Sequence, residues 1–283
     1  MPSSSALSAF HPDWICPDWP APAHVQALCT SRAGGVSAAP YDSLNLGDHV
    51  GDLPEDVHTN RKRLQTALQA HLPAAQAVFL RQVHGTHTVD LDAGLSDGIC
   101  ADACVATMPA KVCTIMVADC LPVLLTDLQG RAVAAAHAGW RGLADGVLES
   151  VFDAFCTRLL HETTPANRWA LAQSTLAWLG PCIGPLAFEV GEEVRAAFCA
   201  HDSRAALHFQ PQTDRPGKYL ADLAALARQR LQALGIRQIS GNDSTSTWCT
   251  VGNPSRFFSH RRDAIALGGS GRMAVCVWRH GGV

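Results

Sequence analysis

Two apolar segments that lie close together in the sequence each carry a side chain able to bind a metal or act as a nucleophile. The segment 113–127 (CTIMVADCLPVLLTD) contains Asp119 and Cys120, and the segment 131–138 (RAVAAAHA) contains His137. Continuous apolar runs bounded by turn residues are typical of strands buried on both faces, and a short turn signal separates these two. An antiparallel hairpin would bring the Cys120 thiol close to the His137 imidazole. Buried polar groups of this kind are costly unless something binds there.

A second histidine, His84 in the segment RQVHG, completes a set of metal-binding side chains. Two imidazoles and one thiolate suit Zn²⁺ and leave a fourth position open for water or substrate. A zinc-bound water has a pKa of about 7 and supplies a nucleophile at neutral pH. We therefore expect His84, Cys120 and His137 as metal ligands. Cys120, His137 and Asp119 are the candidate catalytic residues, and Asp119 would shuttle a proton or orient a ligand.

The same residue types also fit a metal-free Cys–His hydrolase. Cys120 would then be the nucleophile and His137 the base, acting on an amide such as a peptidoglycan precursor. Such a pair does not need His84, which favours the metal. A non-enzymatic binding module is a third reading, and the buried polar trio argues against it. Thirteen histidines offer many accidental triplets, and a lone Cys is often only a small buried hydrophobe.

Length and composition describe an ordinary globular chain. The 283 residues are 47% hydrophobic and 17% charged, which indicates a sizeable core. A net charge of −3 gives no electrostatic footprint for nucleic acid or for an anionic membrane. No signal peptide and no apolar run of about 18 residues is evident, so we expect a cytoplasmic protein. Eleven cysteines, an odd count in a chain without a signal, argue against a disulfide framework.

Strands and helices are predicted in an irregular order. Asp52 and Pro54 are a good N-cap and first-turn pair for a helix that carries Val57, Leu64 and Leu68 on one stripe. Further helices are predicted in the ranges 142–162, 189–201 and 219–235. Strand character is predicted within the ranges 25–37, 77–92, 175–185, 236–240, 246–250, 257–262 and 272–278, besides the central hairpin.

This order lacks a regular β-α-β alternation, so mixed sheets fit better than a doubly wound fold. We predict an α+β fold: one αβ sandwich with mixed β-sheets flanked by helices, spanning residues 25–283 after an irregular lead-in over residues 1–24. The chain contains no GxGxxG after a strand, no GxxxxGK[ST], no HExxH and no GxSxG, which excludes the mechanisms that those motifs carry.

Several motifs, taken together and in order, resemble the YfiH/laccase-domain family. They are TSRAGGVS, SLNLGDHVGD, VHTNR, RQVHGT, MVADCLPVLL, AAHAGWRG, LGPCIGP and FFSHRRD. The resemblance covers residues 25–280, and the MVADC and AHAGWRG blocks are specific to it. It implies a zinc site made by His84, Cys120 and His137. It also implies an αβ sandwich related to the catalytic domain of a bacterial necrotizing toxin.

The family has been labelled a multicopper polyphenol oxidase and, later, a purine nucleoside phosphorylase. The resemblance implies phosphorolysis of adenosine, inosine, guanosine and methylthioadenosine, together with adenosine deamination. Bacterial members are also linked to peptidoglycan editing, the removal of precursors that carry L-Ser in place of L-Ala. A purine nucleoside and phosphate are therefore the expected partners, and a monomer is the expected state.

Phosphorolysis requires cationic side chains that hold phosphate against the ribose. Arg32, Arg61 and Arg141 are the candidates, because guanidinium groups grip phosphate with two hydrogen bonds. Each of them has an alternative role in a surface or structural ion pair. The polar side chains of Asn45, Asn60 and Gln82 are candidates for binding the ribose or the base. Arg261 and Arg262 belong to the motif FFSHRRD and fit a structural role equally well.

The oxidase label predicts copper and the oxidation of phenols. A multicopper oxidase needs about ten histidine ligands in paired HxH-like motifs. This chain has no such pair, and His84 and His87 are separated by two residues. Cu²⁺ could still occupy a His₂Cys site adventitiously, because it binds such ligands more tightly than Zn²⁺.

Overall fold

The computed structural model describes residues 10–281, and the expected single-domain α+β architecture with mixed sheets is confirmed. The strands are β1 (Val25–Cys29), β2 (Gln76–Phe79), β3 (Thr88–Asp90), β4 (Ala103–Ala106), β5 (Lys111–Val117), β6 (Leu121–Asp127), β7 (Val133–Ala138), β8 (Thr175–Leu179), β9 (Glu189–Gly191), β10 (Phe209–Pro211), β11 (Lys218–Ala221), β12 (Gln238–Gly241) and β13 (Met273–Arg279). The helices are α1 (Pro54–His71), α2 (Trp140–Asp145), α3 (Val147–Leu159), α4 (Pro165–Gln173), α5 (Glu192–His201), α6 (Leu223–Ala233) and α7 (His260–Leu267), with short 3₁₀ turns at Leu91–Ala93, Ser203–His208 and Ser246–Trp248.

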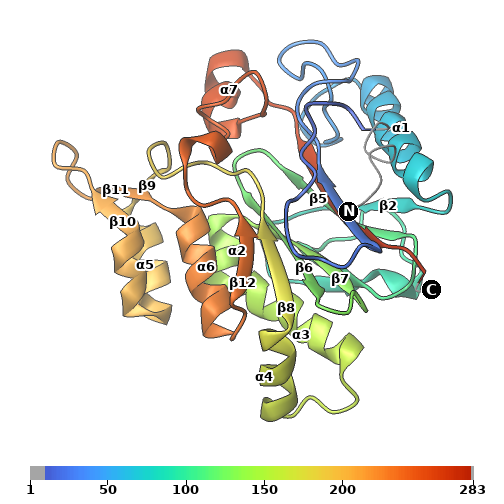
Figure 1. Cartoon of the computed structure of the whole chain (residues 1–283). Helices are drawn as coiled ribbons and strands as arrows, with labels where there is room; N and C mark the ends of the chain where they lie inside the picture. Colours follow the sequence, from blue (N-terminus) through green and yellow to red (C-terminus); the bar gives the residue numbers. More distant parts are fainter. Residues whose placement is uncertain (1–9, 282–283) are drawn as a thin grey trace.

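Two larger sheets form the centre of the molecule. The first has the order β1-β13-β5-β2 and the second has the order β12-β8-β6-β7-β4-β3, while β10-β11-β9 make a small third sheet. Helix α1 lies on one side of the molecule, and α5 and α6 lie on the other (Figure 1). Side chains of α1 pack on the outer face of the four-stranded sheet, and the helices from α2 to α6 pack on the outer face of the six-stranded sheet.

The alternation of side chains along the central strands explains why their sequences are continuously apolar. Val123 and Leu125 of β6 belong to the core beneath the helices, whereas Leu124 belongs to the core between the two sheets. Ala134 and Ala135 of β7 divide between the two cores in the same way. Strands that bury both faces have no polar side to show, which is the physical basis of the sequence pattern.

The apolar segment 113–127 is not one strand. It forms β5 of the four-stranded sheet and β6 of the six-stranded sheet, and it bends at residues 118–120, where Asp119 has a φ of 85°. The predicted hairpin is confirmed for β6 and β7, which pair antiparallel with Pro122 opposite His137. Cys120 therefore lies just before β6, on the connection that crosses from one sheet to the other.

Other local predictions are corrected by the structure. The strand expected over residues 77–92 is interrupted by the loop 80–87 between β2 and β3, and the helix expected over 142–162 is divided at Gly146, which has a φ of 103°. The segment 257–262 leads into α7 rather than forming a strand. The segment 246–250 forms a 3₁₀ turn and a single bridge, between Cys182 and Cys249.

The start of α1 differs in detail from its prediction. Leu53 is the N-cap residue, and the Asp52 carboxylate accepts a hydrogen bond from the Leu53 main-chain N–H at 2.8 Å. Pro54 occupies the first turn, and Val57, Leu64 and Leu68 are buried as expected. The helix itself is thus confirmed, with its cap one residue later.

The N-terminal segment is irregular as far as the structure describes it. Residues 10–24 contain one bridge, between Ile15 and Cys29. The parts of the lead-in and of the domain at residues 1–9 and 282–283 lie outside the described residues, and the boundary at residue 25 stays a prediction. Within residues 10–281, no helix is long and apolar enough to cross a membrane.

Candidate metal centre

His84, Cys120 and His137 converge at one end of the two larger sheets. His84 lies on the loop from β2 to β3 and Cys120 lies on the turn from β5 to β6, and both connections cross from the four-stranded to the six-stranded sheet. His137 lies near the end of β7. The ligand atoms of the three residues lie within 4.8 Å of one another, and Cys120 Sγ is 3.7 Å from His84 Nε2. This group could hold a metal ion.

Asp102 orients two members of the trio and was not singled out in the sequence. Its Oδ1 accepts hydrogen bonds from His137 Nδ1 and from the main-chain N–H of His84, both at 2.9 Å. Its Oδ2 accepts hydrogen bonds from the N–H groups of Val83 at 3.2 Å and Gly85 at 2.8 Å. The carboxylate is fully buried, and it fixes both the His137 ring and the backbone of the loop that carries His84.

Local backbone features allow the three side chains to approach one another. His84 has a φ of 62°, a left-handed conformation that is costly for a residue with a β-carbon and that the Asp102 hydrogen bonds hold in place. A β-carbon at Gly139 would lie 2.8 Å from His84 Cδ2 and 3.0 Å from Cys120 Sγ. The glycine of the AHAGWRG motif therefore leaves the space in which the two ligand side chains meet.

Electrostatics favour the charged forms of the half-buried Cys120 and the buried His137. Burial alone would raise the pKa of Cys120, but the charge of His137 and hydrogen bonds from His137 and His84 lower the pKa to about 6. Burial opposes the charging of His137, yet the Cys120 thiolate and the hydrogen bond to Asp102 raise its pKa to about 9. A thiolate that is available at neutral pH is the form that binds a metal or attacks a carbon.

The trio lies in the wall of a cavity of about 410 Å³. Its apolar lining consists of Met116, Ala118, Trp140, Ile183, Phe188 and Leu223. Its polar lining, besides the trio, consists of His49, Gln82, Asp119, His260, Arg261 and Arg272. A volume in this range, with one apolar wall and a few convergent polar groups, is typical of a small-molecule site.

Two of the three arginines predicted to bind phosphate are engaged elsewhere. Arg32 donates to the carbonyl of Asp42 and forms an ion pair with its carboxylate at 2.9 Å. Arg61 lies over the Phe79 ring at 4.1 Å and forms an ion pair with Asp48 at 3.2 Å. Neither guanidinium lines the cavity, and each already has a counter-charge. The structure does not bring them to the trio.

Arg141 and Gln82 lie nearer to the trio. Arg141 is exposed, and its guanidinium lies over the Trp140 ring at 4.4 Å, outside the lining of the cavity. Gln82 does line the cavity, but its amide exchanges two hydrogen bonds with the main chain of Met116, at 2.7 and 2.8 Å. Gln82 thereby continues the pairing of the loop along β5.

The two asparagines predicted to bind substrate are saturated with protein partners. Asn60 is fully buried, and its amide nitrogen donates to Ser37 Oγ and to the carbonyl of Asn45. Asn45, also fully buried, accepts hydrogen bonds at its Oδ1 from the N–H groups of Gly47 and Arg272. Their side chains organise the loop 36–52 and do not line the cavity.

Asp119 lines the cavity, but its carboxylate is hydrogen-bonded to other parts of the protein. Its Oδ1 accepts a hydrogen bond from the Thr250 hydroxyl at 2.5 Å, and its Oδ2 accepts one from the main-chain N–H of Arg261 at 2.6 Å. Asp119 therefore joins the crossing between β5 and β6 to the start of α7. Its φ of 85° is held by these contacts and by the hydrogen bond from the Ile183 N–H to its carbonyl.

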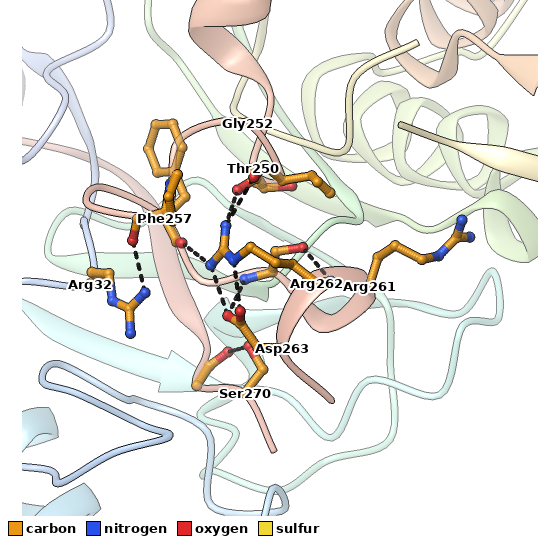
Figure 2. A network of polar contacts seen from close by, with 12 residues as sticks. Arg32, Thr250, Gly252, Phe257, Arg261, Arg262, Asp263 and Ser270 are labelled. Atoms are coloured by element: carbon orange, nitrogen blue, oxygen red, sulfur yellow. Dashed lines mark hydrogen bonds and ion pairs between the residues drawn. The ribbon is translucent and has the colours of Figure 1, made fainter. Parts of the chain in front are cut away.

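The neighbouring arginines 261 and 262 have different surroundings. Arg262 forms two contacts with the Asp263 carboxylate and donates to the carbonyls of Thr250 and Phe257, as Figure 2 shows. The Arg261 side chain extends away from that network and lines the cavity (Figure 2). Arg262 is thus structural, and it stabilises the loop that presents the Thr250 hydroxyl to Asp119.

Sequence reasoning also missed Arg272, His49 and His260, which all line the cavity. Arg272 directly follows the GGSG run and precedes the apolar strand β13. His49 and His260 lie within the motifs SLNLGDHVGD and FFSHRRD, and this position was the signal that could have found them.

Comparison with known proteins gives full-length matches. The family model described as "Multi-copper polyphenol oxidoreductase laccase" matches residues 26–280. The Escherichia coli (strain K12) protein named "Purine nucleoside phosphorylase YfiH" is 48% identical over 264 residues, which are 93% of this chain and 98% of that protein. A Haemophilus influenzae protein named "Purine nucleoside phosphorylase" is 44% identical over 264 residues, again 93% and 98% of the two chains.

Solved structures show the same fold. A crystal structure of a Neisseria meningitidis protein, 43% identical, superposes with a TM-score of 0.83 and covers 95% of this chain and 100% of that one. A Bacillus licheniformis hypothetical protein YfiH, 29% identical, superposes with a TM-score of 0.78 over 90% and 92% of the two chains. The resemblance drawn from the sequence motifs is confirmed over nearly the whole chain.

Proposed function

The chain belongs to the multi-copper polyphenol oxidoreductase laccase family and is an enzyme, and we propose that it is a zinc-dependent purine nucleoside phosphorylase. The observation that carries the proposal is the cluster of His84, Cys120 and His137 in the wall of a cavity of about 410 Å³. The names of the relatives supply the reaction and the substrates.

The donor set fits zinc. Nitrogen and sulfur ligands in a three-residue set are characteristic of catalytic zinc sites, and all three residues line the cavity. The Asp102 carboxylate occupies His137 Nδ1, so Nε2 is the nitrogen left for the metal. When bound, the ion would act as a Lewis acid and as a source of water with a lowered pKa.

The protein itself contributes binding and orientation. The apolar wall of the cavity, which includes Trp140 and Phe188, suits the flat face of a purine. In phosphorolysis a phosphate oxygen forms a bond to ribose C1′ while the C1′–N9 bond breaks, and the base leaves with the bonding electron pair. The chain must therefore hold the phosphate on the side of the ribose opposite to the base. In the second proposed activity, adenosine deamination, water replaces the amino group at C6.

A multicopper oxidase fits the residues less well. Within residues 10–281, His84, Cys120 and His137 are the one group of three or more His, Cys, Asp or Glu side chains arranged to hold a metal. A multicopper site needs several such groups. Copper could occupy the same ligands without supporting phenol oxidation, because a single His₂Cys set binds Cu²⁺ tightly.

The test combines metal analysis with product analysis. Protein purified without added metal should carry about one zinc per chain and should convert inosine and phosphate to hypoxanthine and ribose 1-phosphate. Cys120→Ala should lose both the metal and the turnover. Cys199→Ala, another half-buried cysteine, lies on α5 outside the cavity lining and should retain both. A protein that binds zinc but is inert on every purine nucleoside would contradict the proposed substrate class.

A Cys–His amide hydrolase is the second candidate function, and the geometry gives it one specific support. Cys120, His137 and Asp102 have the order of a nucleophile, a base and a carboxylate that orients the base. The substrate would be an amide such as a peptidoglycan precursor. Chelator-treated protein that still hydrolyses the amide, and that is labelled at Cys120 by an electrophile, would favour this candidate over the zinc enzyme.

A further inference from the structure

The side chain of Arg272 lies in the wall of the cavity and is fixed from several directions. Its main-chain N–H donates to Asn45 Oδ1 at 2.8 Å. Its Nη1 donates to the carbonyl oxygens of Ser270 and Gly271, at 2.8 and 3.1 Å. A β-carbon at Gly47 would lie 2.7 Å from Arg272 Cγ, so the aliphatic stem packs directly against that glycine. The guanidinium is therefore positioned before any ligand arrives, which reduces the entropy lost on binding.

The charge of this guanidinium has no carboxylate partner in the part of the chain that the structure describes. Two of the three arginines that the sequence favoured are neutralised: Arg61 by Asp48 at 3.2 Å and Arg32 by Asp42 at 2.9 Å. In Arg272, by contrast, only Nη1 of the guanidinium donates hydrogen bonds to the described residues, and both go to the carbonyl oxygens of Ser270 and Gly271. A guanidinium has five N–H donors, so the donors of Nε and Nη2 have no protein acceptor among the described residues. A half-buried cation with unused donors in a cavity wall is suited to an anion.

The other donors of the cavity lie around the same space. Arg261, His49 and His260 line it together with Arg272. The one carboxylate in the lining, Asp119, already accepts hydrogen bonds from Thr250 and from the main chain of Arg261. Arg261 donates from Nη1 to the carbonyl of Glu189 at 3.1 Å, and His49 Nδ1 lies 3.4 Å from the Asp48 carboxylate. The two arginines of the lining outnumber its one carboxylate.

We propose that Arg272 is the phosphate-binding residue of this cavity. The inference rests on the proposed function and deepens it, because it assigns the co-substrate to a residue that the sequence motifs did not indicate. Nε and Nη2 form the side of the guanidinium that can bind two oxygens of one phosphate at once. The phosphate group belongs either to inorganic phosphate or to a nucleoside monophosphate, and the two sources share this recognition chemistry.

The test measures phosphate binding and turnover separately on the protein as purified, with its metal. Calorimetric titration with inorganic phosphate, without nucleoside, should show Arg272→Gln binding about 10- to 100-fold more weakly than the parent protein, since two charge-assisted hydrogen bonds are lost. In phosphorolysis of inosine, the same variant should show a raised KM for phosphate and an unchanged KM for inosine. Arg272→Lys should fall between the two, because it keeps the charge and loses the two-point contact.

Arg279→Gln is the matched control. Arg279 is at the opposite end of the same strand, about 20 Å away at the rise of a β-strand. It too donates only to carbonyl oxygens, those of Gly130 and Thr107, and it does not line the cavity. Its loss should leave phosphate binding unchanged. Equal phosphate affinity in the parent protein and in Arg272→Gln would overturn the assignment.

Further arms of the experiment separate the possible failures. The parent protein could bind phosphate, with binding lost in Arg272→Gln, and yet be inert on every purine nucleoside. That result would support the phosphate site and overturn the proposed reaction. Adenosine monophosphate could instead bind at least tenfold more tightly than either phosphate or adenosine, and only when Arg272 is present. That result would assign the site to a nucleotide and overturn the role of inorganic phosphate. If Arg272→Gln does not fold, the KM for phosphate of Arg272→Lys decides: an unchanged value overturns the assignment.

Discussion

Two buried aspartates flank the candidate metal centre, and they make opposite contacts. Asp102 directs its carboxylate at the centre: it binds the His137 ring and three successive main-chain N–H groups of the loop that carries His84. Asp119 is the chain neighbour of Cys120, yet its carboxylate points away and binds Thr250 and the start of α7. Its position next to Cys120 in the sequence indicated Asp119 as catalytic, whereas in the structure Asp102 makes the contacts to His137 and to the loop of His84.

The difference shows how the fold separates two tasks. The Asp102 side determines where the ligand atoms lie and which nitrogen of His137 is free. The Asp119 side attaches the start of α7 and Thr250 to the crossing between the sheets, and Arg262 holds the loop that carries Thr250. Substitutions on the first side should change metal binding and chemistry, and substitutions on the second should change mainly the free energy of unfolding.

The largest effect is expected for Asp102→Asn. The amide nitrogen would face N–H donors at whichever oxygen position it took, so at least one contact to the loop or to His137 is lost. Loss of such a partner behind a metal ligand typically lowers metal affinity about 10- to 100-fold. Competition with a chelator measures the affinity. An unchanged metal affinity in a folded Asp102→Asn variant would contradict the different roles inferred for Asp102 and Asp119.

The next effect concerns the reactivity of Cys120 in metal-free protein. Its pKa of about 6, below the ordinary value for a thiol, means that the thiolate forms as the pH rises through about 6. Alkylation by iodoacetamide, followed by mass spectrometry, should therefore reach half of its maximal rate near pH 6. Asp102→Asn should move this midpoint to higher pH, because His137 loses the hydrogen bond that favours its charged form. Asp119→Asn should leave the midpoint close to that of the parent protein, because Asp119 is hydrogen-bonded to neither Cys120 nor His137.

A smaller effect is expected for Gly139→Ala. The new β-carbon would lie 2.8 Å from His84 Cδ2 and 3.0 Å from Cys120 Sγ, so the ligand side chains must separate. We expect metal affinity to fall about tenfold, by displacement of the first ligands. Gly252→Ala, on the Asp119 side, is the control: its β-carbon would meet nothing closer than 3.7 Å. Equal metal affinities in the two variants would contradict the close packing inferred for Gly139.

The smallest effect on the metal is expected for Asp119→Asn, which should cost stability instead. One of its two buried acceptor positions becomes a donor facing the Arg261 N–H or the Thr250 hydroxyl. Unfolding in urea should show a loss of about 1–2 kcal/mol, with zinc affinity unchanged. Thr250→Val should lose a similar amount, since it removes the other half of the same contact. An Asp119→Asn variant that is as stable as the parent protein but has no activity would support Asp119 as the proton shuttle.

The sequence by itself determined the buried strands and the residue types that set this centre apart. The apolar runs around Cys120 and His137 predicted strands buried on both faces, and the turn between them predicted the pairing of β6 with β7. Both features depend on local sequence: a continuous apolar run indicates a strand buried on both faces, and a short connection between two strands indicates a hairpin. The residue types suggested His84 as the third member, the family motifs implied the same set, and the structure brings the three side chains together.

The tertiary structure decided which polar side chains serve the cavity. Asp102 lies 35 residues from His137 in the sequence, and Arg272 lies 227 residues from Asn45, so no local pattern records these contacts. Arg32, Arg61, Asn45 and Asn60 also had residue types that suited a ligand, but the folding of nearby loops gives them protein partners, such as Asp42 for Arg32 and Asp48 for Arg61. The residue type determines how many hydrogen bonds a polar side chain can form. The packing of the sheets and loops determines which atoms form them.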